Sequence, residues 1–301
     1  MKGVAMLIIE QLKETTFSPA EQIIAKFLLD NPEKLENLTA NDIALATHTN
    51  PTSLVRVAKK IGFRGWSDLK NSYLSEWKYL NSHFTTIDAN LPFSKQDNLL
   101  TIATKIATLE SNTIHDTLSL IDFSTLEHAK RLILDSKQIK LYASHSNSLI
   151  AQDFIIKLRR INIKAYDINI YQYGEIDAYH SDSDTCAILI SYTGENKNLI
   201  SVTKILKERK SKIISLTSIG DNTISKLSDC NFRITTRERL YSKIGNFTSN
   251  TSIVYILDLI YAIIFSANYD KNLNHLLQIG SRFDTRSTSI SILQEKKDET
   301  L

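Results

Sequence analysis

Cysteines and clustered metal ligands are scarce in this sequence. The chain holds two cysteines in 301 residues, Cys186 and Cys230, which lie far apart and each beside an apolar run. That arrangement argues against a disulfide framework or a zinc site and favours two buried thiols. The seven histidines do not cluster with cysteines or carboxylates at ligand spacing. We therefore expect no metal site and no cofactor.

Long apolar runs and a strong excess of one charge are also absent. No apolar run approaches the roughly 20 residues that a membrane-spanning helix needs, and residues 1–9 carry no cleavage signature of a signal peptide. We therefore expect a cytoplasmic protein without membrane contacts. The formal net charge is only +3, so any contact with nucleic acid must come from a local basic patch.

Residues 38–66 have the pattern of two short helices joined by a tight turn. Thr39 and Asn50 are residue types that cap helix N-termini, and Pro51 occupies a first helical position, where its missing N–H costs nothing. Gly62 follows the second helix, as a left-handed C-terminal cap would. This is the layout of a DNA-binding helix-turn-helix, whose second helix enters the major groove. The apolar positions of that helix recur at helical spacing: Leu54, Val57, Ala58 and Ile61.

Positive charge is concentrated on the second of these helices. The segment 51–64 holds four basic residues and no acidic one, whereas the other positions of residues 1–80 hold six lysines and nine acidic residues. A solvated basic face on two small helices remains the alternative interpretation. We expect DNA contacts from Asn50, Thr52, Ser53, Arg56, Lys59, Lys60 and Arg64.

From residue 138 onward the pattern changes to short apolar strands that alternate with helices. This alternation favours right-handed crossovers and a parallel sheet covered on both faces. The overall fold class is therefore α/β, with an all-α N-terminal domain and a doubly wound parallel-sheet domain. The expected strands are 139–143, 163–166, 185–191, 212–217 and 230–234, and the expected helices around them include 99–119, 148–161, 196–209, 221–227 and 248–265.

The length of the chain fits two domains. We assign 1–80 to the helix-turn-helix domain and 81–98, which lack periodicity, to a linker. The sheet domain with its flanking helices covers 99–280, and a polar tail covers 281–301.

Two loops at strand ends are rich in hydroxyl and amide side chains. Each opens a helix, and the free N–H groups and partial positive charge of a helix N-terminus suit phosphate. Serine, threonine and asparagine are also ordinary helix caps, which is the alternative explanation. The candidate ligand-binding residues are Ser144, Ser146, Asn147 and Ser148 in the first loop, and Ser191, Thr193, Gly194 and Asn196 in the second.

Short motifs in both halves of the chain point to one family. They are Arg56, 59–63 (KKIGF), 65–70 (GWSDLK), 151–153 (AQD), 157–160 (KLRR), 190–195 (ISYTGE) and 258–259 (DL). With these motifs, residues 7–77 resemble the N-terminal domain of RpiR-type transcriptional regulators, and residues 125–265 resemble the sugar isomerase (SIS) domain that follows it in those proteins. The resemblance implies a homodimeric or homotetrameric repressor or activator of sugar or amino-sugar metabolism, which binds double-stranded operator DNA and senses a phosphorylated sugar.

The ligand loops depart from the pattern of that family. Ala143 and His145 replace two glycines of the first loop, Thr193 and Asn196 replace a serine and a threonine of the second, and Asn250 replaces an arginine. Glycine lets the backbone approach a phosphate closely, so the effector pocket is altered. We expect weaker or different sugar-phosphate binding, and the imidazole of His145 would add a pH dependence.

Three functions are weighed on these residues. The first is a DNA-binding regulator that is not an enzyme. The second is a sugar-phosphate isomerase or lyase, for which Glu195 or His145 could supply the general base. The third is a regulator whose SIS domain only dimerises. In the first and third cases, we expect helices 99–119 and 248–265 to form the interface between subunits.

Overall fold

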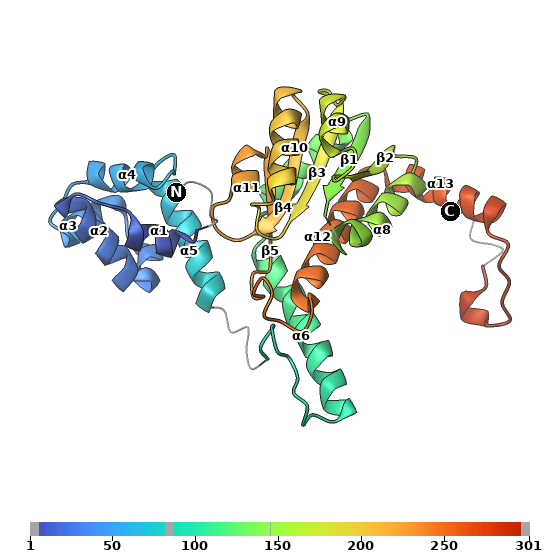
Figure 1. The fold of residues 1–301 in the computed structure, drawn as a ribbon, viewed down its shortest axis with the longest axis horizontal. Helices are drawn as coiled ribbons and strands as arrows, with labels where there is room; N and C mark the ends of the chain where they lie inside the picture. The colour runs from blue at the N-terminus through green and yellow to red at the C-terminus, as the bar shows by residue number, and fades with distance from the viewer. Residues whose placement is uncertain (1–5, 82–86, 145, 296–301) are drawn as a thin grey trace.

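The structure is a computed structural model that describes residues 6–81, 87–144 and 146–295. A helical N-terminal part is followed by a five-stranded sheet with helices on both faces (Figure 1). The expected α/β class, with an all-α first part and a doubly wound parallel sheet, is confirmed. The helices that precede the sheet are α1 (Ile8–Glu14), α2 (Pro19–Asp30), the 3₁₀ helix η1 (Pro32–Asn37), α3 (Ala40–Ala46), α4 (Pro51–Lys60), α5 (Trp66–Asn81), α6 (Leu99–Ser119) and α7 (Phe123–Leu134).

Side-chain caps set the boundaries of α3 and α4. The Thr39 hydroxyl accepts a hydrogen bond from the amide of Asp42 at 3.2 Å, and Asn50 Oδ1 accepts one from the amide of Ser53 at 3.0 Å. Gly62 follows α4 with a φ of +95°, which glycine adopts without strain. Both expected caps and the glycine stop are confirmed. Helices α1 to α5 share one apolar core, to which Ile24, Leu28, Leu54, Val57, Leu69 and Tyr73 contribute fully buried side chains.

The sheet is parallel throughout, in the order β2-β1-β3-β4-β5. The chain runs from β1 to the edge strand β2 and returns to β3 on the other side of β1, so the strand order reverses between β1 and β3. Ala143 at the end of β1 lies level with Ile190 near the end of β3. The strands are β1 (Gln138–Ala143), β2 (Ala165–Asn169), β3 (Thr185–Ser191), β4 (Lys212–Ser218) and β5 (Cys230–Ile234).

Four strands match the expected segments within a residue, and β2 begins two residues later than expected. Asn162 has a φ of +63°, and the amide of Ile163 still donates to Leu158 O at 3.0 Å. The chain is therefore completing the turn that ends the preceding helix where the sequence had predicted a strand.

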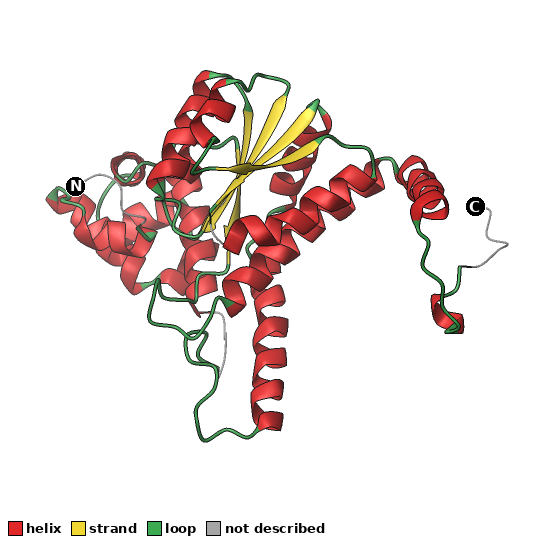
Figure 2. Ribbon diagram, turned by 45° about the vertical axis from the view of Figure 1, so that its right-hand side comes forward, coloured by secondary structure: helices red, strands yellow, loops and turns green. Residues whose placement is uncertain are grey.

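Two helical layers cover the sheet (Figure 2). One layer holds α9 (Gly174–Tyr179), α10 (Lys197–Glu208) and α11 (Thr223–Leu227), and its core includes Leu199, Val202 and Ile224. The other holds α7, α8 (Ser146–Arg160) and α12 (Phe247–Ala267), with a core that includes Phe154 and Ile256. The helices after β1 and after β3 thus lie on opposite faces, as a doubly wound sheet requires.

Helix α12 is long and apolar enough to cross a membrane by length and composition alone. It packs instead against α6, α7 and α8. Ile253, Ile256 and Ile260 of α12 are almost fully buried in the core of the sheet domain. Burial in this core accounts for these apolar positions of the helix, whereas Val254 on the same helix is exposed.

Both cysteines are buried and unpaired, which confirms the expected structural thiols. Burial raises the pKa of the Cys230 thiol to about 12 and raises that of Cys186 as well. Neither sulfur is therefore ionised near neutral pH, and neither is a nucleophile there.

Some helices were not predicted from the sequence. Helix α9 and helix α13 (Tyr269–Phe283) both begin without a side-chain cap, so the usual start signal is missing. Helix α13 runs past residue 281, where the polar tail was expected to begin. It extends away from the sheet (Figure 1) and leads to a short 3₁₀ helix, η2 (Ser291–Leu293).

Candidate DNA interface and effector loops

The basic face of α4 is exposed to solvent. Thr52, Arg56, Lys59 and Arg64 all have exposed side chains. Within the described residues, no ion pair engages Arg56, Lys59 or Arg64. These groups can therefore reach a phosphate or a base edge without first breaking an ion pair in the protein.

Three other predicted DNA-contacting residues have partners inside the protein. Ser53 is buried, and its amide and hydroxyl both donate to Asn50 Oδ1, at 3.0 and 3.2 Å. The ammonium of Lys60 lies 3.0 Å from Glu21 Oε2 and 5.5 Å from the centre of the Phe17 ring. The pKa of Glu21 is lowered, first by a backbone hydrogen bond from Ser18 and then by Lys60. Periodicity identified the correct face but could not separate these capping and ion-paired residues from the free ones.

The two predicted ligand loops lie side by side. They follow β1 and β3, which are adjacent in the sheet and end at the same edge. The strand order reverses at this point, and in open α/β sheets ligands bind in the crevice at such a reversal. The predicted loops therefore occupy the place in the fold where a ligand is expected.

In the first loop, part of the hydrogen-bonding capacity is already used. The hydroxyl of Ser148 donates to the carboxylate of Asp167 at 3.0 and 3.2 Å, and the amide of Asn147 donates to Ser144 O at 3.2 Å. Ser146 is exposed at the start of α8. His145, to which the sequence assigned a pH dependence and a catalytic alternative, lies outside the described residues.

The second loop (residues 191–196, called the effector loop below) makes a tight turn. Gly194 has a φ of +68°, and a Cβ there would lie 2.0 Å from Asn222 Oδ1, so only glycine fits. Thr193 Oγ1 accepts from the amide of Glu195 at 3.1 Å, and Asn196 Oδ1 caps α10. The capping alternative therefore applies to the oxygen of Asn196. Ser191, at the end of β3, is buried.

Glu195 serves as a cap for another helix. Its carboxylate accepts from the amide of Thr223 at 2.7 Å and from the Thr223 hydroxyl at 2.8 Å, at the first turn of α11. A carboxylate near a helix N-terminus is favoured by the helix dipole. To act as a general base, Glu195 would first have to give up both hydrogen bonds.

Glu238, which the sequence analysis missed, is a buried acid beside this loop. Its side chain is fully buried and accepts hydrogen bonds from the amides and hydroxyls of Thr248 and Ser249, at 2.6 to 3.0 Å. Lys243 completes the set with an ion pair at 2.8 Å. The backbone of Glu238 also contacts the effector loop, since the Tyr192 hydroxyl donates to its carbonyl at 2.9 Å and accepts from its amide at 3.2 Å. Glu238 lies ten positions before Thr248, so no local motif predicts the contact.

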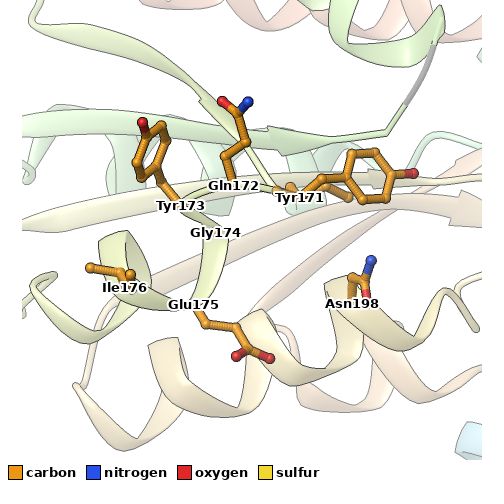
Figure 3. Close-up of a pocket in the computed structure, with 8 residues that line it drawn as sticks. Tyr171, Gln172, Tyr173, Gly174, Glu175, Ile176 and Asn198 are labelled. Atoms are coloured by element: carbon orange, nitrogen blue, oxygen red, sulfur yellow. The ribbon is translucent and has the colours of Figure 1, made fainter.

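A cavity of about 290 Å³ opens between the start of α9 and α10 (Figure 3). It is lined by residues 170–176, which connect β2 to α9 and form the first turn of α9, and by Asn198 of α10. Figure 3 shows that Tyr171 and Tyr173 point in different directions and that Glu175 points toward the helix that carries Asn198. None of the eight predicted ligand-binding residues lines this cavity.

Comparisons with known proteins agree with this architecture. Residues 4–77 match the helix-turn-helix domain of the rpiR family, and residues 132–266 match the SIS domain. These two domains in this order define a helix-turn-helix regulator with an SIS domain. The chain belongs to the RpiR family of HTH-type transcriptional regulators.

Individual relatives support the same assignment. An uncharacterised HTH-type transcriptional regulator of Caldanaerobacter subterraneus is 24% identical over 262 residues, which cover 87% of this chain and 91% of the relative. The structure of Vibrio vulnificus NanR in complex with ManNAc-6P has a TM-score of 0.57 at 20% identity, covering 91% of this chain and 97% of NanR. A Listeria monocytogenes protein proposed as a sugar-phosphate isomerase matches 60% of this chain and 98% of its own, with a TM-score of 0.52 at 15% identity. The structural matches show a shared fold.

We predict that Glu238→Gln lowers the free energy of unfolding at pH 7 by about 3 kcal/mol, as the loss of one member of a buried ion pair does. Burial opposes ionisation of Glu238, but the hydrogen bonds from Lys243, Ser249 and Thr248 outweigh it and hold its pKa below the ordinary value of a glutamate. The stabilisation is therefore present above the ordinary pKa and is lost as the pH falls through the lowered value. The free energy of unfolding of Glu238→Gln should therefore fall less between pH 7 and acidic pH than that of the wild type.

Denaturant unfolding at pH 7 and at pH 4 and below measures both effects. Glu110→Gln, on the exposed side of α6, provides a matched control that should leave stability unchanged. Equal stability of wild type and Glu238→Gln across this range would contradict the assignment of an ionised, stabilising carboxylate.

Proposed function

We propose that this protein is a DNA-binding regulator of sugar or amino-sugar metabolism whose sheet domain senses a phosphorylated sugar. In this proposal residues 1–80 form the DNA-binding domain, 81–98 the linker and 99–280 the SIS domain, followed by a polar tail. The observation that carries it is the pairing, in one chain, of an exposed basic helix α4 with hydroxyl-rich loops at the reversal of the strand order. Such a regulator acts on chromosomal DNA, so it is placed in the cytoplasm and away from the membrane.

DNA binding is assigned to α4 and to the residues that follow it, up to Arg64. Thr52 lies in the first turn, where base contacts of recognition helices concentrate. Arg56 and Lys59 follow on the exposed face, and Arg64 lies just beyond the glycine stop. Lys60 contributes charge to the same surface, and the buried Ser53 contributes through the cap that it forms with Asn50.

We predict that Arg56→Ala weakens binding to promoter DNA by roughly 1–3 kcal/mol and relaxes specificity at one position if it contacts a base. Lys59→Ala, if it removes a phosphate contact, should weaken binding to all sequences alike and reduce the salt dependence. Lys13→Ala, in α1, serves as a charge-matched control that should change neither. Fluorescence anisotropy at several salt concentrations measures these effects. Wild-type affinity in both variants would contradict the assignment of DNA binding to α4.

The effector is assigned to the paired loops after β1 and β3. The N-termini of α8 and α10 both face this edge of the sheet, where the partial positive charge of a helix N-terminus favours an anion, although Asn196 Oδ1 already accepts from the amides of Asn198 and Leu199 in α10. The relative from V. vulnificus was solved with a phosphorylated amino sugar, ManNAc-6P. A ligand of this chemistry fits loops that supply hydroxyls and amides.

Catalysis is not part of this proposal. The isomerase alternative needs a general base, and Glu195 is held by Thr223 at the start of α11. The fold is shared with proteins assigned as isomerases, so the fold alone does not decide between the two. Turnover of a sugar phosphate without any promoter binding would favour the enzyme.

We predict that Ser191→Ala and Thr193→Ala each weaken sugar-phosphate binding about tenfold or more, because a hydrogen bond to a charged group contributes roughly 1.5–3 kcal/mol. Ser148→Ala should have a smaller effect, since that hydroxyl already bonds Asp167. Calorimetry with hexose and amino-sugar phosphates, including ManNAc-6P, measures this. Tight binding that neither substitution affects would place the site elsewhere, and an absence of binding with intact DNA affinity would favour a domain that only dimerises.

We also predict a dimer or tetramer at micromolar concentration. The N-terminal half of α6 extends beyond the body of the domain (Figure 2) and exposes Leu99 and Leu100. Leu118 of α6 and Val254 of α12 add apolar surface on the two helices that were expected to form the interface. Light scattering should give at least twice the monomer mass of 34.2 kDa, and a monomeric mass would contradict the assignment.

A further inference from the structure

The helix-turn-helix domain is held as one unit at its two ends. Glu76 of α5 is buried, and its two carboxylate oxygens accept from the amides of Ile8 and Ile9 at 2.8 and 3.0 Å. The start of α1 and the end of α5 are therefore fixed to each other. A displacement imposed on either end moves the domain that carries α4.

One end of this unit is paired with the loop after β4. Met6 and Asp221 exchange two backbone hydrogen bonds, both of 3.1 Å. Gly220 has a φ of +86°, and a Cβ there would lie 3.0 Å from Met6 O. Arg233 of β5 holds the same loop by donating to the carbonyls of Ser218 and Gly220 at 3.0 and 2.8 Å.

The other end is paired with the loop after β5. The Tyr79 hydroxyl, near the end of α5, accepts from the amide of Thr236 at 2.6 Å. Tyr79 O accepts from the guanidinium of Arg237 at 2.8 Å, and that guanidinium also lies 4.3 Å from the centre of the Tyr79 ring. Asn90 of the linker adds a bond of 2.7 Å from the amide of Arg239.

Both loops also hold the effector loop. On the β4 side, the amide of Ser218 donates to Tyr192 O at 2.8 Å and that of Ile224 to Gly194 O at 3.2 Å. On the β5 side, the Tyr192 hydroxyl bonds the backbone of Glu238, one residue from Arg237. Each route from the effector loop to the helix-turn-helix domain therefore passes through a single segment of chain.

We propose that the effector loop transmits its occupancy to the helix-turn-helix domain through these two tethers, Met6–Asp221 and Tyr79 with residues 236–237. The inference rests on the proposed function of the loop as an anion site. An anion bound at the amides of the loop competes with its present contacts and so favours another arrangement of the two segments. Packed, hydrogen-bonded elements shift between discrete arrangements, which carries the change to α4.

The first experiment compares promoter affinity with and without saturating ManNAc-6P. The ratio of the two dissociation constants measures the coupling. Combining Tyr79→Phe with Gly220→Ala should reduce this ratio at least threefold, while calorimetry still finds ManNAc-6P bound. Tyr73→Phe is the matched control, because its hydroxyl donates to Leu28 O inside the helix-turn-helix domain. An unchanged ratio in the double variant would overturn the proposal.

A second experiment needs no effector, so it tests the tethers independently of whether the effector loop binds a sugar phosphate. Tyr192→Phe removes the hydroxyl that joins the effector loop to Glu238, and it should change promoter affinity at least threefold in the wild-type background. In the Tyr79→Phe background the same substitution should have a clearly smaller effect. Equal effects in both backgrounds, including no effect in either, would overturn the tether even if no sugar phosphate binds.

Discussion

The buried carboxylate of Glu238 is the constraint on which the effector edge of the sheet depends. A charge in the interior is tolerated only when it is paired and hydrogen-bonded, and Glu238 meets this demand with Lys243 and the first turn of α12. These contacts fix the segment between β5 and α12 at Glu238. The backbone of Glu238 bonds Tyr192, and its neighbour Arg237 bonds Tyr79. The effector loop and the helix-turn-helix domain therefore contact the same segment of chain.

The effector loop is built with little room for change. Gly194 lies so close to Asn222 that no side chain fits at that position. The carbonyl of Gly194 and the carboxylate of Glu195 accept hydrogen bonds from the amides of Ile224 and Thr223 in α11. A loop already held in one arrangement loses less conformational entropy when it binds an anion than a flexible loop does. Under the proposed function, a ligand at so closely packed a loop would displace neighbouring segments to gain space.

The sequence predicted those features that depend on neighbouring residues. The caps at Thr39 and Asn50, the stop at Gly62 and the apolar strands follow from local propensity and periodicity, and all are present. The contacts of Glu238, Tyr79 and Met6 join residues that are between ten and more than two hundred positions apart. No single sequence encodes such contacts in a readable pattern, because they depend on how finished elements pack. For the same reason, periodicity grouped Lys60 with the free basic residues although Glu21 binds it.

The hydrogen-bonding partners of the two acids beside the effector loop bear on whether this edge of the sheet suits catalysis or sensing. An isomerase needs a carboxylate or imidazole free to remove a proton from its substrate. Glu195 caps α11 and Glu238 caps α12, so both acids are occupied with amides and hydroxyls of the protein. Apart from His145, which lies outside the described residues, the two loops supply hydroxyls and amides, which can hold an anion but are poor bases near neutral pH. The described part of this edge therefore fits the proposed binding of an anion, while Glu195 and Glu238 hold the segments that lead toward the helix-turn-helix domain.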